Sequence, residues 1–154
     1  MTQNIEYANK NTECVLDIAT DVIQMLTQAG ETLGVAGSLT GGGLMMALTS
    51  VPGSSAVFRG GVVSYATPLK QLLLNVDASL IAEKGVIHGE VAAQMADGTR
   101  KVSTLNENLT TWGIGAIGVA GPTPQDGKPI GMVFIGIASP SGSRGMGPFH
   151  FTGS

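Results

Sequence analysis

The residues T-L-G-V-A-G-S-L-T-G-G-G-L-M-M-A-L, at positions 32–48, decide the fold class of this protein. An apolar run at 32–36 predicts a short strand, glycines at 37–43 predict a bend, and the apolar residues at 44–48 are typical of a buried helix. A strand that turns through glycines into a helix directs backbone N–H groups toward one point, where they can bind an anion. The stretch therefore predicts an α/β domain with a candidate site at the bend.

The sequence on either side of this stretch also predicts alternating helices and strands. Apolar residues recur every three or four positions over residues 12–29, which predicts a helix that ends at a left-handed Gly30. The Gly60-Gly61 pair inside an expected strand indicates a bulge or a close approach of two backbones. The other expected elements are a strand at 56–66, a helix beginning near Pro68, a short helix capped by Asp77, a helix at 90–102, buried strands at 112–120 and 130–138, and an edge strand near 149–151. Helices before, between and after strands predict an α/β layered domain.

The composition leaves two interpretations of the surface open. The chain has 154 residues, which suits one domain, and only 12% of them are charged, against roughly 25% in typical globular chains. Either a homodimer interface buries part of the surface, or the many glycines simply leave few long side chains. The net charge of -3, with no run of Lys and Arg, argues against nucleic acid as the main partner.

Metal, disulfide and membrane functions have no support in the sequence. Cys14 is the single cysteine, and we expect it on the apolar side of the first helix as a packed thiol. His88 and His150 lack the spacing of a ligand pair, so no metal site is expected. No apolar run reaches the roughly 18 residues of a membrane helix. With no signal-peptide pattern at the start, the sequence predicts a cytoplasmic protein.

Three common motifs fail when their context is considered. The G-x-G-x-x-G pattern at 113–118 lies inside an apolar run and no helix follows it, so small residues packed within a sheet are the better interpretation. No Gly-Lys-Ser/Thr follows the bend at 37–43, which excludes a P-loop. Ser38 is not in a G-x-S-x-G nucleophile elbow.

A Ser–Lys arrangement remains as the candidate chemistry. Ser38 lies at the bend, and a serine hydroxyl becomes nucleophilic when a base takes its proton. Lys70 lies among leucines, which favours a lowered pKa, and Tyr65 could relay a proton or orient the amine. The N–H groups of Gly41, Gly42 and Gly43 could hold an oxyanion or a phosphate. Equally, the serine could only cap a helix while the tyrosine packs and the lysine is solvated, and residue chemistry leaves both possibilities open.

Four ordered motifs carry a family resemblance. They are S-L-T-G-G at 38–42, S-V-P-G-S-S-A-V-F-R-G-G-V-V-S-Y-A-T-x-x-K at 50–70, G-V-A-G-P at 118–122 and K-P-I-G at 128–131. Together they resemble the C-terminal domain of the competence-damage-inducible CinA family, over roughly residues 15–153. The resemblance implies one domain at 1–154, with three α/β/α layers and a mixed, largely buried sheet, usually assembled as a dimer.

The same resemblance implies an activity and its residues. Members of the family include nicotinamide mononucleotide (NMN) deamidases, which release nicotinic acid mononucleotide and ammonia without a metal or other cofactor. By the family pattern, the catalytic set corresponds to Ser38, Tyr65 and Lys70. The substrate-binding residues correspond to Thr40, Gly41, Gly42 and Gly121.

Three departures from the family pattern motivate an alternative function. Gly37 stands where the family usually has Glu, and Ile117 where it often has Thr or Ser. The family also continues past F-x-G into a long C-terminal helix, whereas this sequence ends at Ser154, so we expect an exposed apolar face on the sheet. The alternative is a catalytically impaired domain of the same fold that binds nucleotides or serves as a competence- or DNA-repair-associated interaction module.

Overall fold

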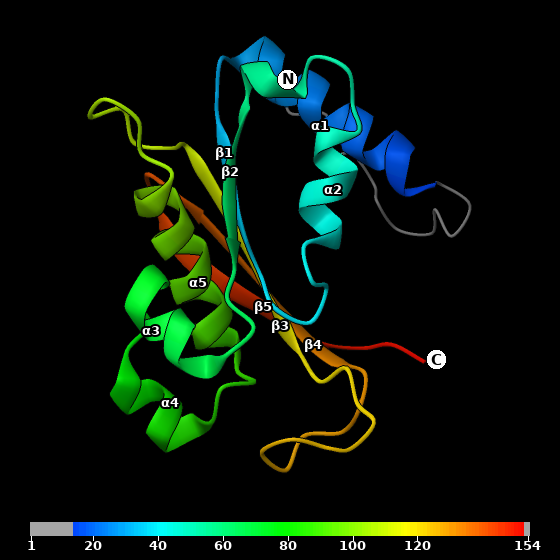
Figure 1. Ribbon diagram of the computed structural model, residues 1–154, viewed down its shortest axis with the longest axis vertical. Coiled ribbons are helices and arrows are strands. Elements are labelled where there is room, and N and C mark those ends of the chain that lie inside the picture. The colour runs from blue at the N-terminus through cyan, green and yellow to red at the C-terminus, as the bar shows by residue number, and fades with distance from the viewer. Residues whose placement is uncertain (1–13, 153–154) are drawn as a thin grey trace.

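Five strands form one mixed sheet with helices on both faces in the computed structural model, which describes residues 14–152. The elements are α1 (Val15–Ala29), β1 (Leu33–Gly37), α2 (Gly43–Thr49), the 3-10 turn η1 (Ser54–Ala56), β2 (Phe58–Val63), α3 (Thr67–Leu74), α4 (Ala78–Lys84), α5 (Gly89–Val102), β3 (Trp112–Gly118), β4 (Met132–Ser139) and β5 (Gly142–His150). Helices α1 and α2 lie on one face of the sheet, and α3, α4 and α5 on the other (Figure 1). The predicted three-layer α/β/α fold is confirmed.

The strand order is β2-β1-β3-β4-β5. Strand β1 pairs in parallel with both β2 and β3, whereas β4 is antiparallel to β3 and β5. The carboxyl ends of β1, β2 and β3 therefore lie at one edge of the sheet. In open α/β sheets, ligands bind at this edge.

Helix α5 packs unusually close to the centre of the sheet. A Cβ added to Gly113 would lie 1.9 Å from the carbonyl oxygen of Ala96, and one added to Gly136 would lie 2.0 Å from that of Ala92. Only glycine permits this separation, because any side chain would enter the helix backbone. The G-x-G-x-x-G pattern is thus a packing feature, as predicted.

The expected irregularity in β2 is confirmed. The pairing register with β1 shifts after Phe58, so that Gly60 rather than Arg59 lies opposite Gly34. A Cβ on Gly61 would lie 1.8 Å from the carbonyl oxygen of Val35. The glycine pair therefore supplies both the bulge and the close approach of two backbones.

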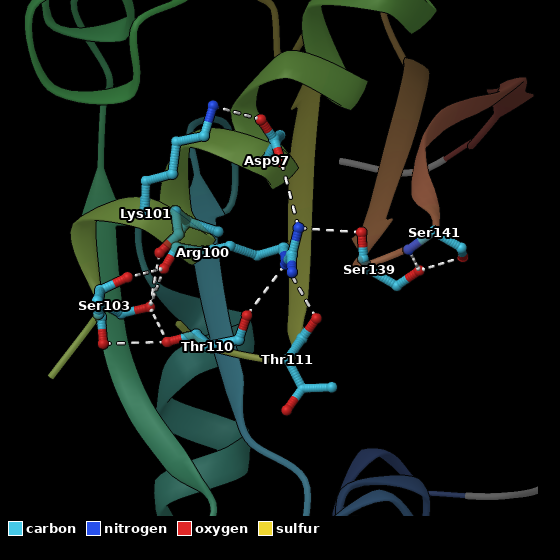
Figure 2. A network of polar contacts seen from close by, with 10 residues as sticks. Asp97, Arg100, Lys101, Ser103, Thr110, Thr111, Ser139 and Ser141 are labelled. Atoms are coloured by element: carbon cyan, nitrogen blue, oxygen red, sulfur yellow. Dashed lines mark hydrogen bonds and ion pairs between the residues drawn. The ribbon is translucent and has the colours of Figure 1, made fainter. Parts of the chain in front are cut away.

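A buried arginine joins three elements at the sheet edge opposite the carboxyl ends of β1 and β3 (Figure 2). Arg100, near the end of α5, is 5% exposed. Its Nε donates to the carbonyl oxygens of Thr110 and Thr111 at 3.0 and 2.9 Å, and its Nη1 donates to that of Ser139 at 2.9 Å. One side chain thereby fixes the start of β3 and the end of β4 to α5.

Helix α1 differs in detail from the expectation. Its buried residues are Ala19, Ile23 and Leu26, whereas Val15 and Ile18 on the expected face are exposed. The expected first positions, 12 and 13, lie outside the described residues. The spacing placed an apolar stripe on the helix, but the position of the sheet and α2 decides which part of it is covered.

The prediction that Cys14 packs on the apolar side of the first helix is wrong. Cys14 is the residue before α1, and its side chain is exposed rather than packed. Its Sγ donates to Asp17 Oδ2 at 3.1 Å. The cysteine lies before the first turn of α1 and is exposed among the described residues, so it is not part of their core.

The C-terminal segment is more regular than expected. Instead of a short strand near 149–151, β5 is a nine-residue strand, and most of its residues are exposed. Its backbone pairing with β4 does not need apolar side chains, which is why the sequence pattern was weak. Within the described residues, no helix is both long and apolar enough to cross a membrane.

Candidate active site

Ser38 follows the last residue of β1 at the carboxyl edge of the sheet, and 7% of it is exposed. Gly41 and Gly42 have φ of 58° and 94°, a conformation that favours glycine and turns the chain into α2. The N–H of Gly41 donates to the carbonyl oxygen of Ser38 at 3.0 Å, which closes the bend. The glycines therefore hold the serine at a fixed corner.

Lys70 meets this serine from α3. It is 1% exposed, and its Nζ lies 3.3 Å from Ser38 Oγ although 32 residues separate the two in sequence. The same Nζ donates to the carbonyl oxygens of Ser64 at 2.5 Å and Tyr65 at 3.4 Å. Three acceptors thus match the three N–H groups of the ammonium form.

Burial lowers the pKa of Lys70 from its ordinary 10.5 to about 8. Desolvation is the cause, because a charged amine loses hydration inside the protein while the neutral amine loses little. At neutral pH, about one tenth of the molecules then carry the free amine. This amine has a lone pair within reach of the Ser38 hydroxyl, so the pair can act as base and nucleophile.

Tyr65 lies close to the pair through its backbone rather than its ring. Its residue is 71% exposed, and within residues 14–152 its phenol oxygen makes no hydrogen bond. It does line the same pocket as Ser38 and Lys70. The structure brings the serine and the lysine into contact and leaves the phenol at the pocket surface.

The pocket above Ser38 and Lys70 has a volume of about 310 Å³. Gly121, a predicted substrate-binding residue, lines it together with residues 123–125 of the connection after β3. Another part of the lining contains Val86 and Ile87 from the connection between α4 and α5. Sequence reasoning missed these two walls, since residues 123–125 read only as a turn and Val86 and Ile87 as ordinary apolar positions.

The other predicted substrate-binding residues lie around the bend with different roles. The N–H groups of Gly41 and Gly43 are used inside the bend, the second donating to the carbonyl oxygen of Thr40 at 3.0 Å. The N–H of Gly42 makes no hydrogen bond among the described residues, and Gly42 itself does not line the pocket. The Thr40 side chain lines a neighbouring apolar groove instead of the pocket.

The two positions that depart from the family pattern have different surroundings. A Cβ on Gly37 would contact Thr40 Oγ1 at 3.3 Å and the N atom of Gly42 at 3.9 Å, so a side chain here would point into the bend. Ile117 is 1% exposed and lines the pocket while packing into the core. The described residues contain no group of three or more His, Cys, Asp or Glu side chains that could hold a metal ion.

Sequence comparison gives a family and close relatives. The model of the CinA C-terminal domain matches residues 15–154. A "CinA-like protein" from Frankia casuarinae is 49% identical over 122 residues, covering 79% of this chain and 27% of the relative. One from a Synechococcus species is 46% identical over 131 residues, covering 84% and 30%. The chain therefore spans less than a third of these curated relatives.

Solved structures give the same result for the fold. A competence-damaged protein (CinA) superfamily protein from Klebsiella pneumoniae aligns with a TM-score of 0.84 at 26% identity, covering 92% of this chain and 85% of that one. The competence/damage inducible protein CihA from Agrobacterium tumefaciens aligns with a TM-score of 0.77 at 28% identity, covering 86% and 78%.

Proposed function

Because the chain belongs to the CinA C-terminal domain family, we propose that it is an amidohydrolase that converts NMN to nicotinic acid mononucleotide and ammonia. The observation that carries the proposal is the 3.3 Å contact between Lys70 Nζ and Ser38 Oγ at the buried base of a pocket. Because the pKa of Lys70 is lowered to about 8, its neutral amine can act as a base toward the Ser38 hydroxyl. As part of the same proposal, the protein acts as a cytoplasmic homodimer in pyridine-nucleotide salvage.

The first half-reaction forms an acyl-enzyme. The neutral amine of Lys70 accepts the hydroxyl proton of Ser38, and the serine oxygen attacks the carboxamide carbon of NMN. The carbonyl oxygen becomes an oxyanion, and the free N–H of Gly42 lies in the same bend to bind it. The C–N bond then breaks as the ammonium of Lys70 returns its proton to the leaving nitrogen, which departs as ammonia.

The second half-reaction releases the acid. A water molecule attacks the acyl carbon while Lys70 takes one of its protons, and that proton returns to Ser38 as the ester bond breaks. In the first half-reaction, Tyr65 assists the transfer of the Lys70 proton to the leaving nitrogen when its phenol turns from the surface of the pocket toward the amine. The balanced reaction consumes one water and needs no external oxidant, reductant or phosphoryl donor.

Ammonia release from NMN tests the proposal. We expect the protein to turn over NMN, and we expect Ser38→Ala and Lys70→Met each to lower kcat by about a thousandfold or more. Ser55→Ala and Lys101→Met, at exposed positions away from the pocket, serve as matched controls. Activity that survives both site substitutions would contradict the mechanism.

A nucleotide-binding domain without turnover is the second candidate. The exposed phenol of Tyr65 and the absence of a side chain at Gly37 favour it, since both remove a group from the neighbourhood of the nucleophile. Calorimetric binding of NMN with no ammonia released would support this candidate. Robust turnover would exclude it.

A further inference from the structure

The connection between β3 and β4 ends in a tight turn. Gln125 and Lys128 exchange both backbone hydrogen bonds, at 3.1 and 2.8 Å. Between them, Asp126 and Gly127 have φ of 49° and 72°. Two central residues with positive φ form the two-residue turn that is common in hairpins. We refer to residues 121–130 as the pocket hairpin.

Two side chains of this turn bond back to the connection between α4 and α5. Asp126 Oδ2 accepts a hydrogen bond from the backbone N–H of Val86 at 3.3 Å, and Lys128 Nζ donates to the carbonyl oxygen of Ile87 at 2.5 Å. The chain also approaches closely at Gly85, where an added Cβ would lie 3.3 Å from Asp126 Cβ. Two charged side chains thus hold together segments 40 and 41 residues apart in sequence.

These bonds join the two outer walls of the candidate active site. Val86 and Ile87 line the pocket, and so do residues 123–125 of the hairpin. Asp126 and Lys128 do not line the pocket themselves. Their charged groups therefore bind backbone groups of Val86 and Ile87 rather than facing the pocket.

Little else anchors the tip of the pocket hairpin. Residues 121–127 are all exposed, and so are residues 129 and 130, while Lys128 alone is half-buried. Exposed segments with few buried contacts open at low free-energy cost. Hydrogen bonds to charged groups are stronger than neutral ones, so these two contacts decide where the hairpin lies.

We infer that Asp126 and Lys128 are positioning residues that hold the pocket hairpin in place as a wall of the nucleotide pocket. The inference rests on the proposed function. Ser38 and Lys70 are positioned by the end of β1 and by α3, independently of the hairpin. Loosening the hairpin therefore weakens substrate binding and leaves the reacting pair in place.

Steady-state kinetics with NMN test this division of roles. We expect Lys128→Met and Asp126→Ala each to raise KM by about fivefold or more while kcat stays within about twofold. Lys128→Arg keeps a donor and Asp126→Asn keeps an acceptor, so both restore KM. Lys101→Met, an exposed lysine paired with Asp97, is the matched control.

Hydrogen–deuterium exchange provides a readout that needs no substrate. We expect faster exchange of residues 121–130 in Lys128→Met, and ordinary rates in Lys128→Arg. Unchanged KM together with unchanged exchange in both disruptive variants would overturn the inference. A loss of kcat accompanied by a lower melting temperature would also overturn it, because it would show a general loss of structure. A wild-type protein that releases no ammonia refutes the proposed function instead, and exchange together with calorimetric NMN affinity then decides the role of the hairpin.

Discussion

Lys70 is the residue in which stability and the proposed activity conflict. Its amine is almost completely buried, and the three acceptors around it are two carbonyl oxygens and the Ser38 hydroxyl. None of these carries a charge that would offset the lost hydration. A group that is poorly suited to stabilise the fold is well suited to act as a base near neutral pH.

The pH dependence of activity follows from this burial. The base must be neutral, and the pKa of Lys70 is lowered to about 8. We expect kcat/KM for NMN to rise about tenfold per pH unit below that value and to level off above it. Measurement from about pH 7 upward keeps the substrate phosphate in one ionisation state. A flat profile between about pH 7 and pH 9.5 would contradict Lys70 as the base.

Replacing Lys70 should stabilise the protein while removing activity. Below about pH 8 the folded and unfolded chains both carry the charged amine, so the whole cost of burying it is present. The difference between pKa values of 10.5 and about 8 corresponds to about 3 kcal/mol. Loss of the hydrogen bond to Ser64 and of the two longer ones to Ser38 and Tyr65 offsets about 2 kcal/mol, so Lys70→Met should raise the free energy of unfolding by about 1 kcal/mol at neutral pH.

The sign of the pH effect provides the check. Between about pH 8 and pH 10.5 the unfolded wild-type chain binds more protons than the folded one, so wild-type stability rises with pH. The advantage of Lys70→Met should therefore shrink over this range in urea titrations. Lys101→Met, at an exposed lysine, should show no such trend. A constant difference from pH 7 upward would show that burial does not lower the pKa.

At the scale of elements, the candidate site and the Arg100 network lie at opposite ends of the strands of the sheet. The carboxyl ends of β1 and β3 carry the pocket, whereas the opposite edge carries the Arg100 network (Figure 2). Because of this separation, the hydrogen bonds that link α5 to β3 and β4 can be removed without changing the geometry of the candidate site.

Arg100→Met tests this separation. The substitution removes the donors to Thr110, Thr111 and Ser139 and leaves their carbonyl oxygens without that partner. We expect the free energy of unfolding to fall by about 3 kcal/mol. The folded variant should keep its kcat for NMN. Lys101→Met, whose surface ion pair is worth little, is the control on the same helix.

At the scale of the whole molecule, the described residues 14–152 leave one face of the sheet partly uncovered. Ile114 and Ile137 pair across β3 and β4, as do Ala116 and Ile135. These residues line apolar grooves between the α1–α2 layer and the rest of the sheet. With charged residues at 12% of the chain, this face favours association over the alternative of a merely glycine-rich surface.

We therefore predict a homodimer in solution. Sedimentation should give a mass twice the 15.7 kDa of one chain at micromolar concentration. Ile135→Lys places a charge in the open face and should shift the equilibrium toward the monomer. Lys101→Met, outside that face, should leave it unchanged. A wild-type protein that sediments as a monomer would favour the glycine-rich interpretation.

The sequence predicted those features whose cause lies in a few neighbouring residues. Gly30 ends α1 with φ of 67°, and Asp77 Oδ1 caps α4 by accepting from the N–H of Ser79 at 2.9 Å. The Gly60-Gly61 bulge and the α/β layering belong to the same class. Each depends on local sterics, capping or hydrophobic period, which residue type alone reveals. The four motifs also identified the family correctly.

Only the tertiary structure decided what meets what. Ser38 and Lys70 are brought together by the pairing of β1 with β2 and the return of α3, and no local pattern encodes that contact. The carbonyl oxygen of Ser64, which holds the amine, belongs to the backbone and carries no residue-type signal. The exposed ring of Tyr65 depends likewise on how neighbouring elements pack. Residue identity determines the available chemistry, and packing determines which groups can use it.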